Sequence, residues 1–191
     1  MKKIFYFLGL FLFLQSCSEQ PKMATHDVNI DSLLQIGVYA PKPMYYKKST
    51  EHTSMKFYEK LGFRESRCNY NVVNHAGYLG KYQFHINTLK GLGISVSKKE
   101  FLMDTLLQEK AVRLYVSFNK KVLKEYISNY DGSDYIIEND TFLITTSGLC
   151  AAAHLGGAGN VIKLFTENKV FKDGNGVPIT SYIKEFANYD I

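Results

Sequence analysis

The stretch GYLGKYQF at residues 77–84 is the segment from which the fold of this chain is most directly inferred. The pair Glu65-Ser66 precedes it, and the small-residue run GLCAAAHLGGAGN follows at 148–160. Gly77 and Gly80 allow the backbone to pass close to a ligand, because glycine has no Cβ. The three blocks together predict a helix end, a turn-rich segment and a tightly packed helix, in that order.

The block that contains Glu65 has helical spacing. Phe57 and Leu61 place an apolar face on a helix of roughly three turns that begins in residues 49–53 and ends near Arg67. Glu65 is therefore expected in its last turn. Residues 69–82 are rich in Asn, Gly and Tyr, which predicts a loop or a small hairpin.

A second group of helices is expected between the first two blocks and the third. Residues 84–92 predict a helix that ends at Gly93, and Ser97 to Glu100 have the spacing of a capping box. The lysines of the long helix that follows are interpreted as a solvated face and not as a binding patch. The apolar stripe predicted for that helix consists of Leu107, Ala111, Leu114, Phe118, Val122 and Tyr126.

The C-terminal third is also read as mainly helical. Residues 131–140 predict a polar connection, and Thr146 or Ser147 is expected to cap a helix that runs to His154. A short helix at 161–165, a turn at 172–176 and a terminal helix at 179–186 complete the chain. The turn lacks the acidic twelfth ligand of a calcium loop, so no metal is predicted there. The fold class is mainly α, with a small loop or hairpin lobe.

The N-terminal segment has the features of an export signal. Lys2 and Lys3 precede an apolar stretch that is too short to span a bilayer, and it ends in LQSC at 14–17. This ending resembles a bacterial lipobox, which implies cleavage before Cys17 and lipid attachment to it. The alternative is a plain secretory signal with an incidental cysteine. We therefore expect a signal peptide at 1–16, a lipidated tether at 17–50 and one domain at 51–191.

The net charge and the cysteine content bear on the binding partners of the chain and on a disulfide. The formal charge is +5, and loss of Lys2 and Lys3 leaves +3, which is too small to predict nucleic-acid binding but favours an anionic cell envelope. Cys68 and Cys150 remain after lipidation. Outside the cytoplasm they either form a disulfide or are two small buried residues.

Glu65 is the candidate for acid–base chemistry. Cleavage of a glycosidic bond needs a carboxylic acid that protonates the leaving oxygen, and an apolar or aromatic surrounding keeps such a group protonated. Tyr82 offers a flat face and a hydroxyl, and Gln83 can donate to and accept from a sugar. Without Glu65 upstream, the favoured interpretation of the 77–84 block is a hairpin with a packed Tyr and Phe.

The blocks ES, GYLGKYQF and GLCAAAHLGG resemble the lysozyme-like superfamily of soluble lytic transglycosylases and goose-type lysozymes. QEKA at 108–111 and KDGNGVPITSYIKEF at 172–186 resemble a peptidoglycan-directed branch of it. The resemblance spans about residues 55–187 and implies an α+β lysozyme-like fold with a glycan cleft. It implies that Glu65 is the catalytic acid and that Ser66 supports this acid. Gly80, Tyr82 and Gln83 match the second sequence motif of the family, which lines the glycan subsites.

The third motif departs from the family pattern. Ala152, Ala153 and His154 stand where the family has Ala-Tyr-Asn, and Lys81-Tyr82 replace a small apolar pair. Tyr70 and Tyr78 are expected among the glycan-binding residues with Tyr82, and either is a candidate to take over the role of the missing Tyr. His154 is either a glycan ligand or a packed or capping residue.

The resemblance implies a lipid-anchored envelope enzyme that cleaves the bond between N-acetylmuramic acid and N-acetylglucosamine in peptidoglycan strands. A single Glu suffices in many such enzymes, where the sugar's own C6 hydroxyl attacks and a 1,6-anhydro product forms. A second carboxylate is not assigned, and the candidates for one are Asp104, Asp131, Asp134 and Asp140. No cofactor, metal or nucleic-acid partner is expected, and the oligomeric state is open.

Two other functions compete with this one. The first is a non-catalytic lysozyme-fold lipoprotein that binds cell-wall glycan or a protein partner, and the altered third motif favours it. The second is cleavage of chitin-type N-acetylglucosamine polymers, which the predicted location in the cell envelope disfavours.

Overall fold

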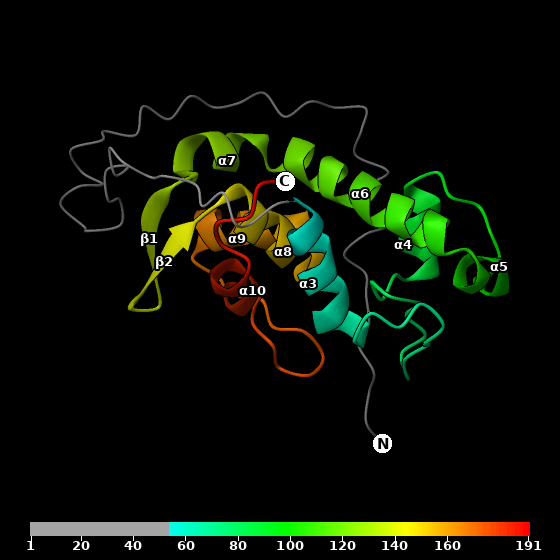
Figure 1. Ribbon diagram of the computed structural model, residues 1–191. Coiled ribbons are helices and arrows are strands. Elements are labelled where there is room, and N and C mark those ends of the chain that lie inside the picture. The colour runs from blue at the N-terminus through cyan, green and yellow to red at the C-terminus, as the bar shows by residue number, and fades with distance from the viewer. Residues whose placement is uncertain (1–53) are drawn as a thin grey trace, which may run out of the picture. The chain divides into compact units, whose positions relative to one another are not determined.

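The computed structural model describes residues 54–191 (Figure 1). The predicted signal peptide, the lipidation site Cys17 and the tether at 17–50 lie outside the described residues. All of the elements described below belong to one compact unit. They are α3 (Ser54–Ser66), α4 (Ile86–Gly91), α5 (Lys98–Met103), α6 (Thr105–Val122), α7 (Lys124–Tyr130), β1 (Ser133–Ile137), β2 (Asp140–Ile144), α8 (Thr146–Gly156), α9 (Ala158–Glu167) and α10 (Ile179–Glu185).

The predicted mainly α class is confirmed, since helices account for 57% of the described residues and the sheet has two strands. The predicted helices at 84–92, 161–165 and 179–186 correspond to α4, α9 and α10. The capping box is present: Glu100 N donates to Ser97 Oγ, and Ser97 N donates to a Glu100 carboxylate oxygen.

Helix α8 forms the centre of the fold and contacts α6, α9 and α10. In Figure 1, α6 and α7 run along one side of α8, and α10 lies on the other side. Its small residues explain the close packing. A Cβ on Gly148 would lie 2.7 Å from the Ile183 carbonyl oxygen of α10. Thr145 caps the helix by accepting from Gly148 N at 3.0 Å.

Helix α3 is held against the C-terminal segment of the chain. The Phe57 ring makes edge contacts with Phe186 and Tyr189, at centroid distances of 5.6 and 5.9 Å. Lys60 Nζ donates to the Glu185 carbonyl oxygen at 2.7 Å. These contacts fix the direction of α3 and therefore the position of its last turn, which carries Glu65.

The segment between α3 and α4 is the predicted loop or small hairpin. Leu79 is fully buried and forms isolated bridges with Val73 and with Phe84. Gly80 and Gln83 both have positive φ, at 70° and 51°, so the chain reverses tightly over four residues. This reversal directs the main chain of residues 81–82 toward the end of α3.

The segment 131–140, predicted as a polar connection, contains the first strand and the turn of a β-hairpin. Residues 133–137 and 140–144 pair as an antiparallel hairpin with Ser133 opposite Ile144. Along β1, Ser133, Tyr135 and Ile137 are buried while the residues between them are exposed. The alternation is short and is flanked by acidic residues, which hides it in the sequence. Glu138 and Asn139 form the turn with positive φ at both positions.

The stripe predicted for the long helix is also partly wrong. The helix is interrupted at Asp104 and Leu123, so it forms α5, α6 and α7. Leu114 and Phe118 of the predicted stripe are 39% and 50% exposed. The buried face is rotated because polar side chains that bond to other segments belong to it. That face consists of Gln108, Ala111, Val112, Tyr115, Val116 and Asn119.

Among the helices of residues 54–191, none combines the length and apolarity that crossing a bilayer requires.

Candidate active site around Glu65

Glu65 lies in the last turn of α3 and is half-buried. Tyr182 Oη, from α10, donates a hydrogen bond of 2.7 Å to Glu65 Oε1. Tyr182 is 4% exposed. Burial, followed by the charge of Glu65, raises the pKa of the Tyr182 hydroxyl, so the hydroxyl remains a donor at neutral pH. One oxygen of Glu65 is therefore held in place.

Two charged side chains surround this pair. The Arg64 guanidinium lies over the Tyr182 ring, 5.2 Å from its centroid, and Arg64 Nη1 lies 3.4 Å from Glu185 Oε2. A hydrogen bond with Tyr182 raises the pKa of the Arg64 guanidinium, and partial burial opposes part of this rise. The ring of Tyr182 is thus packed between α3 and α10, with its hydroxyl bonded to Glu65.

Ser66 links the end of α3 to the 77–84 block. Ser66 Oγ donates to the Lys81 carbonyl oxygen at 2.8 Å and accepts from Asn69 N at 3.0 Å. The Ser66 hydroxyl thus joins the end of α3 to the loop of the second block, and its support of Glu65 stays a prediction.

Behind this loop lies a buried charge cluster that the sequence reading missed. Lys81 Nζ donates to Glu109 Oε1 at 2.7 Å, and Lys81 is 7% exposed. The hydroxyl of Tyr70 donates to Glu109 Oε1 at 2.8 Å, and that of Tyr82 donates to Oε2 at 2.9 Å. Three donors from the loop thus converge on one carboxylate of α6.

The cluster keeps both of its charged groups ionised. Burial alone would raise the pKa of Glu109, but hydrogen bonds from Lys81, Tyr70 and Tyr82 outweigh it and lower the pKa. Burial alone would lower the pKa of Lys81, and hydrogen bonds to Glu109, Tyr82 and Tyr70 raise it instead. The result is a partly desolvated ion pair whose two partners depend on each other.

The Gln108 side chain, from α6, holds the same loop between α3 and α4 by hydrogen bonds to its main chain. Its Oε1 accepts from Lys81 N at 2.9 Å, and its Nε2 donates to the Tyr70 and Phe101 carbonyl oxygens at 3.0 Å each. A Cβ on Gly80 would lie 2.0 Å from Gln108 Oε1. Gly80 is therefore needed for close approach of the backbone to this amide, and not, as predicted, to a ligand.

Gln83 is the residue of the second block that remains partly exposed. Its Nε2 donates to the Gly80 carbonyl oxygen at 2.8 Å, which stabilises the tight reversal. No hydrogen bond involving Gln83 Oε1 is present within residues 54–191, so this oxygen is able to accept one from a ligand.

The three tyrosines proposed to contact glycan are arranged differently from the expectation. Tyr82 has no exposed surface, so its ring cannot stack on a sugar. Tyr70 bonds to Glu109, and Tyr78 packs its ring against His85 at 5.5 Å. The tyrosine hydroxyl that bonds to Glu65 is that of Tyr182, from α10.

His154 is partly buried in the last turn of α8. Its Nε2 lies 2.9 Å from the Tyr82 carbonyl oxygen, and its ring makes edge contacts with Phe84 and Tyr115. Its Nδ1 is buried without a hydrogen-bond partner in the described part of the chain. Of the two interpretations, the packed residue is the one that fits, and His154 connects α8 to the loop of the second block.

Both cysteines are free thiols, so the structure does not contain the disulfide that the sequence left open. Cys68 Sγ lies 3.6 Å from the Glu59 carbonyl oxygen in the turn after α3. Cys150 is fully buried in α8, and burial raises its pKa to about 12. Cys150 is therefore a neutral core residue.

The aspartates considered as a second carboxylate have other roles or positions. Asp104 Oδ1 accepts from Leu107 N, and Asp131 Oδ1 accepts from Thr146 N, so both hold helix starts. Asp134 and Asp140 lie exposed on the hairpin. In the part of the chain that the structure describes, no three His, Cys, Asp or Glu side chains are placed to hold a metal ion.

Tyr182 and Glu109 are the principal residues that the sequence reading missed. Both lie in segments that were noted for their resemblance, SYIKEF and QEKA, so a signal for them existed. What the sequence lacked was the pairing of Tyr182 with Glu65 and of Glu109 with Lys81.

No family model, no curated protein and no solved structure matches this chain, so its function has to be argued from its own residues.

Proposed function

We propose that this chain cleaves peptidoglycan between N-acetylmuramic acid and N-acetylglucosamine, with Glu65 as the general acid/base. We further infer that its fold is lysozyme-like and that lipid on Cys17 anchors it in the cell envelope. Wall remodelling and antibacterial attack are both compatible with this activity.

The contact between the three sequence blocks is the observation that carries the proposal. Ser66 bonds to the main chain of the second block at Lys81, and His154 of the third block bonds to that block at Tyr82. Blocks separated by up to 88 positions in the sequence are thus linked through the main chain of residues 81–82. This is the arrangement expected if they build one site.

The hydrogen bonding of the two Glu65 carboxyl oxygens supports the same chemistry. Tyr182 orients the carboxyl group through Oε1, whereas Oε2 has no hydrogen bond to any described residue. In the proposed mechanism Oε2 carries the proton that is delivered to the bridging oxygen. The acetamido group of the substrate stabilises the developing cation, and attack by the C6 hydroxyl gives a 1,6-anhydro product.

The non-catalytic glycan-binding lipoprotein is the competing function. It is favoured by the burial of Tyr82 and by the contact of His154 Nε2 with the Tyr82 carbonyl oxygen, because both residues were expected to bind glycan. The hydrogen bond between Tyr182 and Glu65 is also one that a purely structural carboxylate makes.

Release of muropeptides from purified sacculi by residues 18–191 tests the proposal. Glu65→Gln keeps an acceptor for Tyr182 but cannot deliver a proton, and we expect at least about a hundredfold loss of rate. Glu59→Gln removes an exposed carboxylate from the same helix and is the matched control. Mass spectrometry distinguishes 1,6-anhydro ends from the reducing ends of hydrolysis.

The remaining outcomes assign the other functions. If the parent protein releases nothing between pH 4.5 and 8 but still binds sacculi, the glycan-binding function replaces the proposed one. If it degrades chitin and leaves sacculi intact, the substrate class is wrong.

A further inference from the structure

The exposed face of α6 and of the first residue of α7 combines cationic and apolar side chains. Leu106, Leu114 and Phe118 are 80%, 39% and 50% exposed, although large apolar side chains usually pack inward. The exposed positions recur every three or four residues, so they form one continuous face. This face, called the α6 outer face below, consists of Leu106, Lys110, Arg113, Leu114, Ser117, Phe118, Lys121 and Lys124.

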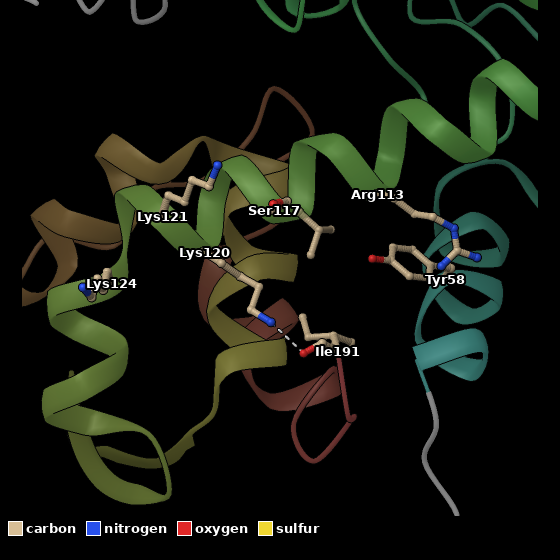
Figure 2. Close-up of a pocket in the computed structure, with 8 residues that line it drawn as sticks. Tyr58, Arg113, Ser117, Lys120, Lys121, Lys124 and Ile191 are labelled. Atoms are coloured by element: carbon tan, nitrogen blue, oxygen red, sulfur yellow. Dashed lines mark hydrogen bonds between the residues drawn. The ribbon is translucent and has the colours of Figure 1, made fainter.

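An open hollow of about 350 Å³ adjoins the α6 outer face (Figure 2). Half of its eight lining residues are cationic, and Tyr58, Val116 and Ile191 contribute apolar surface. The Arg113 guanidinium lies over the Tyr58 ring, 4.5 Å from its centroid. The hollow therefore combines positive charge with carbon-rich walls, which suits an anion attached to an apolar group. The cationic members are Arg113, Lys120, Lys121 and Lys124.

Few carboxylates balance these charges. Between Thr105 and Lys124 the sequence contains one acidic residue, Glu109, and its carboxylate is bonded to Lys81. The ion pairs Arg64–Glu185 and Lys81–Glu109 involve none of the cations of the hollow. Lys120 Nζ donates to Ile191 O at 2.6 Å. Glu125, exposed in the first turn of α7, is the next acid along the chain.

We propose that the α6 outer face docks on an anionic phospholipid surface, with a headgroup phosphate in the hollow. Lysine and arginine side chains near such a surface attract its phosphates, and exposed apolar side chains enter the boundary between headgroups and acyl chains. The combination of both on one face favours a lipid surface over a soluble anion, which leaves Leu114 and Phe118 unused. The lysines that the sequence reading assigned to a solvated face are here binding residues.

The fold gives this contact a consequence. Helix α8 separates α6 from α10, which carries Tyr182 of the candidate active site (Figure 1). A domain docked through α6 thus turns α10 away from the lipid. The inference does not depend on the proposed glycosidase activity, since it rests on a different face and on different residues.

Vesicle co-sedimentation of residues 18–191 tests the proposal without the lipid anchor. Every core residue that the structure describes lies between Phe57 and Tyr189, so this protein retains that core. We expect binding to vesicles that contain phosphatidylglycerol and none to vesicles of phosphatidylcholine alone. The binding should weaken as salt is raised, because salt screens the charges.

Two variants separate the charged from the apolar contribution. Lys121→Gln with Lys124→Gln should weaken binding about thirtyfold at low salt. Leu114→Ser with Phe118→Ser leaves the charge unchanged and should weaken it roughly tenfold. Lys172→Gln with Lys184→Gln removes the same charge from exposed positions near α10 and is the matched control, expected to bind like the parent. Thermal melting of each variant confirms that the fold is retained.

Three results would overturn the proposal. Equal binding to both kinds of vesicle is one. A second is a loss in the Lys172/Lys184 control that equals the loss in the α6 variants, which would indicate net charge alone. The third is saturable binding of soluble glycerol phosphate by a protein that binds neither kind of vesicle.

Discussion

Tyr182 Oη donates to Glu65 Oε1 at 2.7 Å, and 117 positions separate the two residues in the sequence. The bond joins the last turn of α3 to α10, and the stacking of Tyr182 on Phe186 at 5.5 Å fixes the ring that carries it. The geometry of Glu65 therefore depends on the C-terminal helix, and not on the aromatic residues of the neighbouring loop.

Tyr182→Phe should reduce the proposed activity while the fold is retained. The ring still fills its site between α3 and α10, but Glu65 loses the donor that orients it, and a loss of roughly tenfold to a hundredfold in rate is expected. The lost hydrogen bond should cost about 1 kcal/mol of unfolding free energy. Muropeptide release and chemical denaturation measure the two effects.

Tyr126→Phe is the control for this change. Tyr126 is half-buried and packs against Phe165, with ring centroids 5.2 Å apart. The substitution Tyr126→Phe should leave the rate of muropeptide release unchanged. If Tyr182→Phe were as active as the parent on sacculi, Tyr182 would not be a positioning residue for Glu65.

Ser66→Ala should lower both stability and activity. It removes the hydrogen bond to the Lys81 carbonyl oxygen and one of the two acceptors of Asn69 N, which also donates to the Ser66 carbonyl oxygen, and we expect a cost of about 1 kcal/mol. Because these bonds fix the turn after Glu65, the rate on sacculi should fall as well. Ser128→Ala, at an exposed position of α7, should change neither quantity. A stability loss with unchanged rate would restrict Ser66 to a structural role.

Glu109→Gln should be one of the most destabilising single changes near the site. It leaves the buried Lys81 ammonium without its counter-charge, which typically costs about 3–5 kcal/mol. Glu167→Gln, at an exposed position of α9, should change the unfolding free energy by less than about 0.5 kcal/mol. Lys81→Met combined with Glu109→Leu should recover much of the loss, because neither charge then remains unpaired. A double variant no more stable than Glu109→Gln would contradict the pairing.

The same cluster predicts how stability depends on pH. The pKa of Glu109 is lower in the folded chain than its ordinary value of 4.5, so its stabilising contribution is present above that value. The contribution is lost as the pH falls through the folded-state pKa. Lys81 has a raised pKa, so its contribution to stability is fully present below its ordinary pKa of 10.5. It therefore does not affect the loss of stability at acid pH.

Denaturation midpoints measured from pH 7 down to pH 3 check this dependence. The difference in stability between the parent and Glu109→Gln should shrink toward acid pH, since the parent loses its ion pair there. A difference that stays constant over this range would show that Glu109 is not ionised in the folded chain.

Gly80→Ala should destabilise the chain much more than Gly93→Ala. Both glycines have positive φ, at 70° and 78°, so both substitutions carry the backbone cost of about 1 kcal/mol. Only at Gly80 does the new methyl group collide with Gln108, whereas at Gly93 nothing lies within 4 Å. Thermal melts of the two variants isolate the collision. Equal losses would mean that Gln108 moves aside at no cost.

Local features of the fold were predictable because short patterns decide them. Helix α3 follows from the spacing of Phe57 and Leu61, and the start of α5 follows from the capping box at Ser97. The placement of Glu65 in a last turn needs no information beyond this local pattern. The small residues of α8 likewise predict a buried helix, since only close neighbours can cover it.

Errors arose where a local pattern had two solutions. Leu114 and Phe118 repeat at a helical spacing, but so do Val112, Tyr115 and Asn119, and only the packing of α6 against α8 selected the second set. The β1–β2 hairpin was missed because its alternation spans five residues on each strand and begins beside charged positions.

The nature and position of Glu65 and Ser66, and the tight turn at Gly80, follow from residues close together in the chain. The partners of these residues do not. Tyr182 reaches Glu65, and Glu109 reaches Lys81, because α6 and α10 pack beside segments far from them in sequence. A side chain's own neighbours set its backbone conformation, whereas its hydrogen-bond partner is set by how all of the helices fill one core. Tertiary packing alone thus decided that Tyr82 is buried and that Tyr182 orients the candidate acid.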